Sequence, residues 1–219
     1  MSLELKKRIF TSVVLLCLLT MMFFFKFVLI ISLIIIAIVC WVEFYALISK
    51  IFLKNNRADQ LLRFSLKGMS LFYLSFLVSL IIIQSKNPEL NLVVIYAILI
   101  SIMTDVGGLI VGKIFKGKKL TKISPNKTIS GSIGSFTFSL LLIPFSIKYF
   151  VDYSFLQLFI FTILVSLISQ MGDLLISFLK RKARVKNTSD LLPGHGGVLD
   201  RIDGIIFAIP TAIFLVINF

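Results

Sequence analysis

The residues most suited to chemistry lie near the carboxyl end of the chain. Residues 191–204 read LLPGHGGVLDRIDG and bring the sole histidine, His195, close in sequence to Asp200, Arg201 and Asp203. Glycines flank the histidine on both sides, which indicates a loop whose backbone can approach a ligand closely. Because this polar cluster directly precedes an apolar segment, we expect it to bind something charged. The alternative is that Asp200 and Asp203 only cap the following helix.

A second loop of similar character lies at residues 124–134, which read SPNKTISGSIG. It places Lys127 and Thr128, followed by small residues, immediately before another apolar segment. Free N–H groups at a helix N-terminus, together with a nearby lysine, bind phosphate readily. The spacing differs from G-x-x-x-x-G-K-[ST], so this is not a Walker-type loop. The alternative is a lysine that is simply solvated in a cytoplasmic turn.

Both loops belong to a chain whose composition suits lipid rather than water. Hydrophobic residues make up 58% of the sequence and the mean hydropathy is +1.03, whereas soluble domains are roughly half apolar. A transmembrane helix needs about 20 mostly apolar residues. The sequence therefore predicts an all-α, polytopic membrane bundle of about seven transmembrane helices. They are expected at 9–25, 27–49, 68–85, 91–112, 131–148, 155–178 and 202–218.

We expect one membrane domain over residues 1–219, with N-terminal helices at 1–90 and catalytic helices and cytoplasmic loops at 91–219. The first apolar segment has the basic start of a secretory signal. It lacks a small-residue cleavage site before the second span, so we expect it to be retained. Cys17 and Cys40 lie inside predicted spans without metal-like spacing, which predicts that they pack in the core.

The basic residues predict the orientation in the membrane. With a cytoplasmic N-terminus, the outside segments keep only Lys26, Lys86 and Lys148 of the 23 lysines and arginines. This bias predicts basic cytoplasmic loops and an external C-terminus. Insertion topology and contact with an anionic leaflet account for the net charge of +13. Nucleic-acid binding is therefore not expected.

Acidic residues inside the predicted spans are the sharper signal. Only ten exist in the chain, and Glu43, Asp105 and Asp173 fall within spans, where an ionised carboxylate facing lipid costs several kcal/mol. Asp105 and Asp173 lie near the cytoplasmic ends of their spans, at a depth similar to Asp200. This pattern favours carboxylates from separate helices that hold a metal ion beside phosphate-binding cations. Neutralisation of Asp173 by Lys180 or Arg181 is the alternative. Glu43 is expected to be an interfacial or interhelical hydrogen-bonding group rather than a catalyst.

The region 177–203, which reads SFLKRKARVKNTSDLLPGHGGVLDRID, resembles the signature of the phosphatidate cytidylyltransferases. That pattern is S-x-x-K-R, four residues, K-D, a small residue two later, and L-x-P-G-H-G-G-x-x-D-R-x-D. Upstream, SQMGD at 169–173 is similar to the family's S-Q-x-G-D, and 124–128 is similar to its S-P-x-K-T. The segment that begins at Asp105 is similar to the family's D-x-G segment. The resemblance covers most of residues 100–205.

This resemblance implies a reaction in phospholipid biosynthesis at the cytoplasmic face of a cell (inner) membrane. CTP and phosphatidate would give CDP-diacylglycerol and pyrophosphate with Mg²⁺ as cofactor. The lipid phosphate is already anionic, so positioning and charge neutralisation can carry catalysis without a strong base. We leave open a second cation and the oligomeric state, a homodimer included.

The resemblance also implies roles for individual residues. Groups implied to bind phosphates, orient them or assist the reaction are Lys127, Lys180, Arg181, Lys186, His195, Arg201 and Asp203. Further substrate contacts are implied for Ser124, Thr128, Ser177, Gly196 and Gly197. The implied Mg²⁺ ligands are Asp173 and Asp200.

Three positions depart from the family's pattern. Asn187 stands where an aspartate is usual, and Ser130 and Ile176 stand where glutamates are usual. Each departure removes a negative charge near the expected site. Asn187 and Ser130 can still form hydrogen bonds, whereas Ile176 cannot. Altered cation binding, reduced activity and a changed substrate are all consistent with these departures.

Two other functions stay open at this stage. One is a related CTP-dependent transfer to another lipid phosphate. The other is a transporter of an ion or anionic solute, with which Asp105 and Asp173 are compatible. Against transport, the polar signals gather at one membrane face, and the sequence has no repeated, broken-helix halves.

Overall fold

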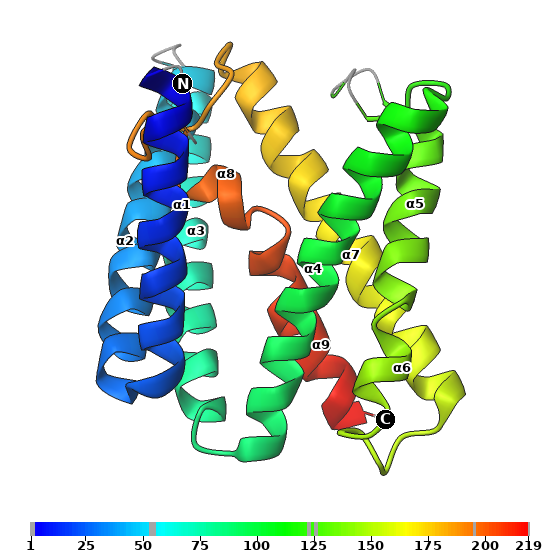
Figure 1. Cartoon of the computed structure of the whole chain (residues 1–219). Helices are drawn as coiled ribbons and strands as arrows, with labels where there is room; N and C mark the ends of the chain where they lie inside the picture. The colour runs from blue at the N-terminus through cyan, green and yellow to red at the C-terminus, as the bar shows by residue number, and fades with distance from the viewer. Residues whose placement is uncertain (1–2, 53–55, 122–123, 125–126, 195, 219) are drawn as a thin grey trace. The chain divides into compact units, whose positions relative to one another are not determined.

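The computed structural model describes residues 3–52, 56–121, 124, 127–194 and 196–218 (Figure 1). These residues form helices and connecting loops, with isolated β-bridges but no strand in the described ranges. The helices are α1 (Leu3–Phe24), α2 (Lys26–Ile51), α3 (Arg57–Gln84), α4 (Pro88–Phe115), α5 (Ile129–Leu140), α6 (Ile143–Ser146), α7 (Phe155–Lys182), α8 (Leu199–Ile202) and α9 (Ile205–Asn218). The expected all-α fold is confirmed.

The chain folds as two compact units. The first combines residues 1–82 with residues 179–202, and so contains α1, α2, most of α3 and α8. The second combines residues 83–178 with residues 203–219, and contains α4, α5, α6, most of α7 and α9. The glycine-rich segment before α8 therefore folds with the N-terminal helices, although it lies more than 100 residues downstream of them.

Five segments are long and apolar enough to cross a membrane, so the chain is a multi-pass membrane protein. They are Lys26–Ile51, Arg57–Gln84, Leu90–Phe115, Ile129–Ser146 and Phe155–Lys182. The expected spans at the two chain ends are helical but shorter. The apolar part of α1 is Phe10–Phe24, and α9 has 14 residues, which reach about 21 Å of a core about 30 Å thick.

The expected span at 131–148 is not one continuous helix. It divides into α5, which ends at Leu140, and α6, which begins at Ile143. Pro144 lies within the first turn of α6 and has no N–H to continue the preceding helix. Proline is tolerated in the first turn of a helix, where N–H groups have no partner within the helix, which explains why the break falls there.

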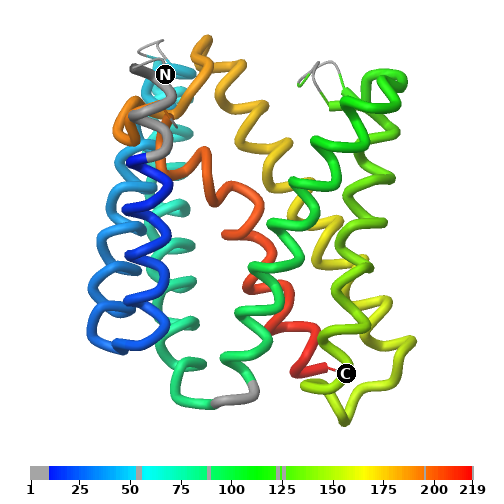
Figure 2. Tube along the Cα trace, in the orientation of Figure 1, coloured from blue at the N-terminus to red at the C-terminus, as the bar shows by residue number. Residues whose placement is uncertain are grey.

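In the first unit, α1 and α2 form the expected tight hairpin. They contact each other and lie side by side, with only Phe25 between them (Figures 1 and 2). The indole N–H of Trp41 on α2 donates to the carbonyl of Lys67 on α3 at 3.2 Å, and the Lys67 ammonium lies 3.3 Å from the centre of the Tyr45 ring. Only 17% of the most apolar stretch of α2 or of α3 is buried by protein, so most of their surface suits lipid.

In the second unit, α4 and α5 approach closely because glycines face each other. A Cβ on Gly107 would lie 2.5 Å from the carbonyl oxygen of Gly134 and 2.6 Å from the Cβ of Phe138. Small residues at helix contacts allow this approach within membranes. Buried hydroxyls then join α4 to α7. Thr104 and Ser166 lie 2.7 Å apart between their hydroxyl oxygens.

We predict that Gly107→Ala lowers the free energy of unfolding by about 1–3 kcal/mol, because the added methyl group overpacks the contact between α4 and α5. Thermal unfolding in detergent measures the change. Gly68→Ala in α3 is the matched control, since a Cβ there has nothing within 4 Å. The control should be neutral or slightly stabilising. Equal melting temperatures for the two variants would contradict a tight glycine contact.

Candidate functional site

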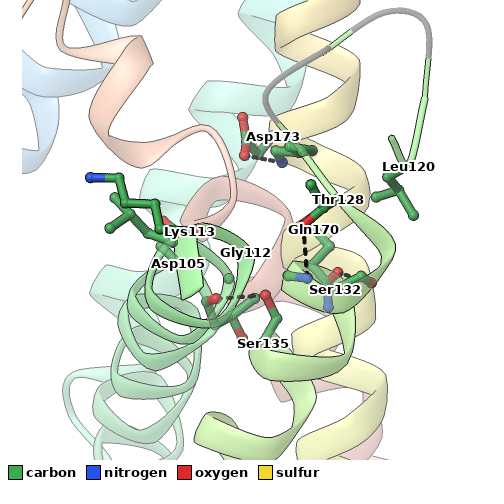
Figure 3. Close-up of a pocket in the computed structure, with 14 residues that line it drawn as sticks. Asp105, Gly112, Lys113, Leu120, Thr128, Ser132, Ser135, Gln170 and Asp173 are labelled. Carbon is green, nitrogen blue, oxygen red and sulfur yellow. Dashed lines mark hydrogen bonds and ion pairs between the residues drawn. The ribbon is translucent and has the colours of Figure 1, made fainter. Parts of the chain in front are cut away.

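A polar cavity of about 600 Å³ lies within the second unit. Its walls come from α4, α5, α7 and the segment that precedes α5 (Figure 3). Charged and polar side chains line it, among them Asp105, Lys127, Thr128, Gln170 and Asp173. In a helical bundle of lipid-facing residues, a cavity with these groups can accept a charged headgroup or nucleotide.

Lys127 and Asp173 form an ion pair at this cavity. The two side chains are about a quarter exposed, at 27% and 23%. Ser177, one turn further along α7, donates a hydrogen bond to Asp173 Oδ1 at 3.3 Å. The structure thus brings together three residues that the sequence predicted for the site, from two elements that are 46 positions apart in the chain.

The loop before α5 holds Lys127 through main-chain contacts. Leu120 N–H donates to the Lys127 carbonyl at 2.8 Å, and Lys127 N–H donates to the Ser124 carbonyl at 3.0 Å. Thr128 is the N-cap of α5, and its hydroxyl oxygen accepts from Gly131 N–H at 3.0 Å. Thr128 lines the cavity as expected, whereas Ser124 belongs to the supporting turn and is not one of the lining residues.

Gln170 is a lining residue that the sequence did not single out. Ser132 donates to its Oε1 at 2.6 Å, and its buried Nε2 has no hydrogen-bond partner among the described residues. Figure 3 shows this side chain between α7 and α5, close to Ser132. The signal in the sequence was its spacing, because residues i and i+3 of a helix share a face and Asp173 is three positions later.

The first unit contains a second polar centre, built around Asp200. Lys180 donates to its Oδ1 at 2.6 Å, with side-chain exposures of 14% for Lys180 and 9% for Asp200. Asp200 Oδ2 accepts from Thr188 N–H at 2.8 Å, from Thr188 Oγ1 at 3.0 Å and from Gly197 N–H at 3.1 Å. Burial alone would raise the pKa of Asp200, but the Lys180 ammonium and two backbone N–H groups hold it below its ordinary value.

These donors belong to the segment 183–198, which we call the signature loop. Leu192 and Gly196 exchange both backbone hydrogen bonds, at 2.8 and 3.1 Å, and close a tight turn. Gly194 and Gly196 have φ angles of 77° and 84°, a region in which glycine carries no steric cost. The predicted residue His195 lies outside the described residues.

Glu43 on α2 is buried beneath the signature loop, at 4% exposure. Its carboxylate accepts four hydrogen bonds. The donors are Thr188 Oγ1, Ser189 Oγ and the N–H groups of Val198 and Leu199. We expected hydrogen bonds to another helix from this residue. Three of the four donors lie in the loop instead, and the fourth, Leu199, is the first residue of α8.

The remaining predicted residues have different surroundings. Arg181, Lys186 and Arg201 are exposed side chains of the first unit. Gly196 and Gly197 are buried in the signature loop, where a Cβ on Gly197 would collide with Thr188 and Glu43. Gly197 therefore serves close packing in this structure.

Asp203 belongs to the second unit and is 7% exposed. Its Oδ1 accepts from Gly204 N–H at 2.9 Å, next to the start of α9. Its main-chain oxygen would lie 2.7 Å from a Cβ on Gly172, so α7 packs closely against this turn. The predicted role of Asp203 beside Arg201 or a metal ion stays a prediction.

The described residues contain no group of three or more His, Cys, Asp or Glu side chains placed to hold a metal ion. Asp173 lies in the second unit and Asp200 in the first. Each carboxylate by itself suits Mg²⁺, which is usually bound through one or two carboxylates together with substrate phosphates. The Mg²⁺ site therefore stays a prediction.

The three departures from the family's pattern have structural counterparts. Ile176 is 1% exposed and belongs to the core, so no acidic group stands on that face of α7. Ser130 Oγ lies 3.0 Å from Thr128 Oγ1 and accepts from Gly117 N–H at 3.2 Å. The exposed Asn187 lies in the signature loop, against Gly196. Ser130 thus makes hydrogen bonds at its position, and Asn187 packs against the loop backbone.

This chain is similar to known proteins in both a family profile and individual sequences. Residues 3–219 match the profile of a family described as the Cytidylyltransferase family. Proteins named phosphatidate cytidylyltransferase match at 43% identity over 129 residues in Staphylococcus aureus (strain COL), at 42% over 128 residues in Staphylococcus haemolyticus (strain JCSC1435) and at 40% over 149 residues in Rickettsia prowazekii (strain Madrid E). The two staphylococcal matches cover 57% of this chain and 49% of the relative, and the rickettsial match covers 64% of each. The chain thus spans about half the length of the staphylococcal relatives.

We predict that Lys127→Met lowers the free energy of unfolding by about 1–2 kcal/mol, because it leaves a partly buried carboxylate without its cation. In Lys127→Met/Asp173→Leu, the apolar pair should recover most of this loss, as expected for two coupled residues. Thermal unfolding measures both. Lys113→Met, on α4 at the same cavity, is the control. Additive losses in the double variant would show that the pair does not interact.

Proposed function

Because the chain belongs to the cytidylyltransferase family, we propose that it transfers the cytidylyl group from CTP to phosphatidate and so forms CDP-diacylglycerol and pyrophosphate. The observation that carries this proposal is the cavity of about 600 Å³ that Lys127 and Asp173 face together at the N-terminus of α5. A lysine beside the positive end of a helix dipole suits phosphates. The name shared by the relatives supports the choice of CTP and phosphatidate.

The proposed reaction is a displacement at the α-phosphorus of CTP. An oxygen of the phosphatidate phosphate forms the new P–O bond, and the bond from the α-phosphorus to the bridging oxygen breaks. Pyrophosphate leaves with that electron pair. The attacking oxygen is already anionic near neutral pH, so the chain's residues need to orient the two phosphates and neutralise their charge.

Several cations of this chain are suited to that task. Lys127 pairs with a carboxylate at the cavity, and Lys180 pairs with Asp200. A lysine is a compact charge on a flexible stem, so either ammonium can turn from its carboxylate to a phosphate oxygen. We propose that the exposed side chains Arg181, Lys186 and Arg201 add phosphate contacts.

We propose Asp173 and Asp200 as the Mg²⁺ ligands. Bound Mg²⁺ would neutralise charge on the triphosphate and on the departing pyrophosphate. The carboxylates themselves must stay ionised for this role. For Asp200 the lowered pKa supports that state, because its hydrogen bonds stabilise the anion.

The proposed location is a bacterial cell membrane, with the reacting groups at the cytoplasmic face. The distribution of lysine and arginine supports this orientation, as cytoplasmic loops carry an excess of both. The acyl chains of phosphatidate would stay in the lipid, and only the headgroup would enter the cavity. The relatives named above are bacterial, which supports the choice of membrane.

We predict that purified chain incubated with labelled CTP, phosphatidate and Mg²⁺ forms labelled CDP-diacylglycerol and releases pyrophosphate in equal amount. Asp173→Asn and Asp200→Asn should each lower kcat by about 100-fold or more, since each removes a charge that the proposed cofactor needs. Thin-layer chromatography of the lipid product measures the activity.

Asp152→Asn, an exposed acid between α6 and α7, is the control for this assay and should keep the activity of the wild type. No pyrophosphate from the wild-type chain would refute the proposed function, and this is the result expected of a transporter. A second lipid phosphate that reacts faster than phosphatidate would replace the proposed acceptor. Undiminished activity in either aspartate variant would refute that residue's role.

We predict that Gln170→Leu raises KM for CTP about ten-fold with a smaller effect on kcat, because it removes the free amide N–H donors at the cavity. Steady-state kinetics over a range of CTP concentrations measure both constants. Ser132→Ala is the matched control, because it removes the hydroxyl that contacts Gln170 Oε1 but keeps the amide. Equal KM values for Gln170→Leu and the wild type would exclude Gln170 from the binding of CTP.

A further inference from the structure

We propose that Glu43 is a positioning residue, which fixes the signature loop and through it orients Asp200 for the reaction. This inference rests on the proposed function, since it gives Glu43 a part in the same site. Glu43 lies on α2, about 140 residues before the loop in the sequence and outside the motifs from which the sequence analysis inferred the resemblance. Both groups belong to the first unit.

The hydrogen bonds of Glu43 leave it no capacity for a substrate. Its Oε1 accepts from Ser189 Oγ at 2.6 Å and from Val198 N–H at 3.0 Å. Its Oε2 accepts from Thr188 Oγ1 at 2.8 Å and from Leu199 N–H at 2.9 Å. An ionised carboxylate has about four acceptor sites, so the four donors occupy them all. Glu43 must therefore act through its neighbours.

The four donors lie on both sides of the tight turn in the signature loop, three in the loop and one at the start of α8. Thr188 and Ser189 precede the tight turn that Leu192 and Gly196 close. Val198 and Leu199 follow the turn, and Leu199 begins α8. A single buried carboxylate thus joins the two arms of the loop and fixes the first turn of the helix that carries Asp200.

Thr188 transmits this constraint to Asp200. Its hydroxyl oxygen lies 2.8 Å from Glu43 Oε2 and 3.0 Å from Asp200 Oδ2, so its one hydrogen is shared between two carboxylates. Its backbone N–H also donates to Asp200 Oδ2, at 2.8 Å. Thr188 is 7% exposed, so water does not readily replace these contacts.

Gly197 makes this arrangement sterically possible. A Cβ at this position would lie 2.5 Å from Glu43 Oε2 and 2.7 Å from Oε1, and would overlap the Thr188 hydroxyl. The absence of a side chain lets the loop backbone lie against the carboxylate, and Gly197 N–H donates to Asp200 at 3.1 Å. Close packing against Glu43 thus explains why a glycine, Gly197, stands at the second glycine position of the HGG sequence.

The test uses the full chain with CTP, phosphatidate and Mg²⁺, and two isosteric variants. Glu43→Gln keeps the shape but replaces one acceptor oxygen by a donor, and Thr188→Val keeps the shape but removes the hydroxyl. We expect each to lower kcat by about ten-fold or more, with KM for CTP changed less than about three-fold. Thr188→Ser keeps the hydroxyl and should retain activity within about two-fold of the wild type.

Two further measurements separate positioning from general stability. Glu43→Gln/Thr188→Val should be no worse than the poorer single variant, because both act through one network. Hydrogen–deuterium exchange of residues 187–200 should rise about ten-fold or more in Glu43→Gln, while exchange in α4 and α5 stays as in the wild type. Asp59→Asn, in the first turn of α3, is the control from the same unit and should change neither quantity.

The proposal is overturned if Glu43→Gln keeps both kcat and the slow exchange of the loop. It is also overturned if the loop exchanges faster with kcat unchanged, if exchange rises equally in both units, or if the two substitutions are additive. Should Glu43→Gln fail to fold, the pair Thr188→Val and Thr188→Ser still decides the question. If the wild type makes no CDP-diacylglycerol, the proposed function fails, whereas the exchange data still report whether Glu43 holds the loop.

Discussion

The constraint on which this structure depends is the cost of placing carboxylates in a protein made mainly of lipid-facing helices. An ionised acid in such surroundings needs a cation or several hydrogen-bond donors. Asp173 meets this need with Lys127, Asp200 with Lys180 and backbone N–H groups, and Glu43 with four donors. Each acid thereby fixes a loop, because the partners that neutralise it come from loops or helix ends.

The sequence predicted the positions of the helices better than it predicted which segments pack against one another. Uninterrupted apolar runs located both ends of α2, α4 and α7 and the end of α3 within about four residues, since length and hydropathy alone decide whether a segment can cross lipid. The start of α3 was missed, because the helix begins at Arg57 in a polar stretch before the apolar run expected from residue 68. The break before α6 was missed because one proline changes a helix without changing hydropathy. Folding of the signature loop with α2 could not be predicted, because no local pattern encodes a contact between residues so distant in sequence.

In the candidate site, too, the sequence predicted some residues and missed the contacts of others. The spacing of Lys127, Thr128 and Asp173 marked them as functional, and the structure brings all three to one cavity. Gln170 lay in the SQMGD motif but was given no role, because an amide in an apolar helix gives a weaker signal than a charge. Glu43 was noticed as an intramembrane acid, but its surroundings in the sequence suggested only an interfacial or interhelical hydrogen-bonding group. What identifies it is the set of donors that the fold delivers to it.

The two carboxylate centres differ in the kind of group that satisfies them, and this difference bears on which can respond to a ligand. Glu43 is bonded by two hydroxyls and two backbone N–H groups, and loss of any of them would leave a buried polar group unsatisfied. Asp173 has an ion pair with one lysine and a long hydrogen bond from Ser177. The lysine can turn to a phosphate because its stem is flexible, and the proposed Mg²⁺ would then neutralise the carboxylate that it leaves. We therefore expect substrate phosphates to displace the contact between Lys127 and Asp173, whereas the hydrogen bonds of Glu43 stay in place throughout the reaction.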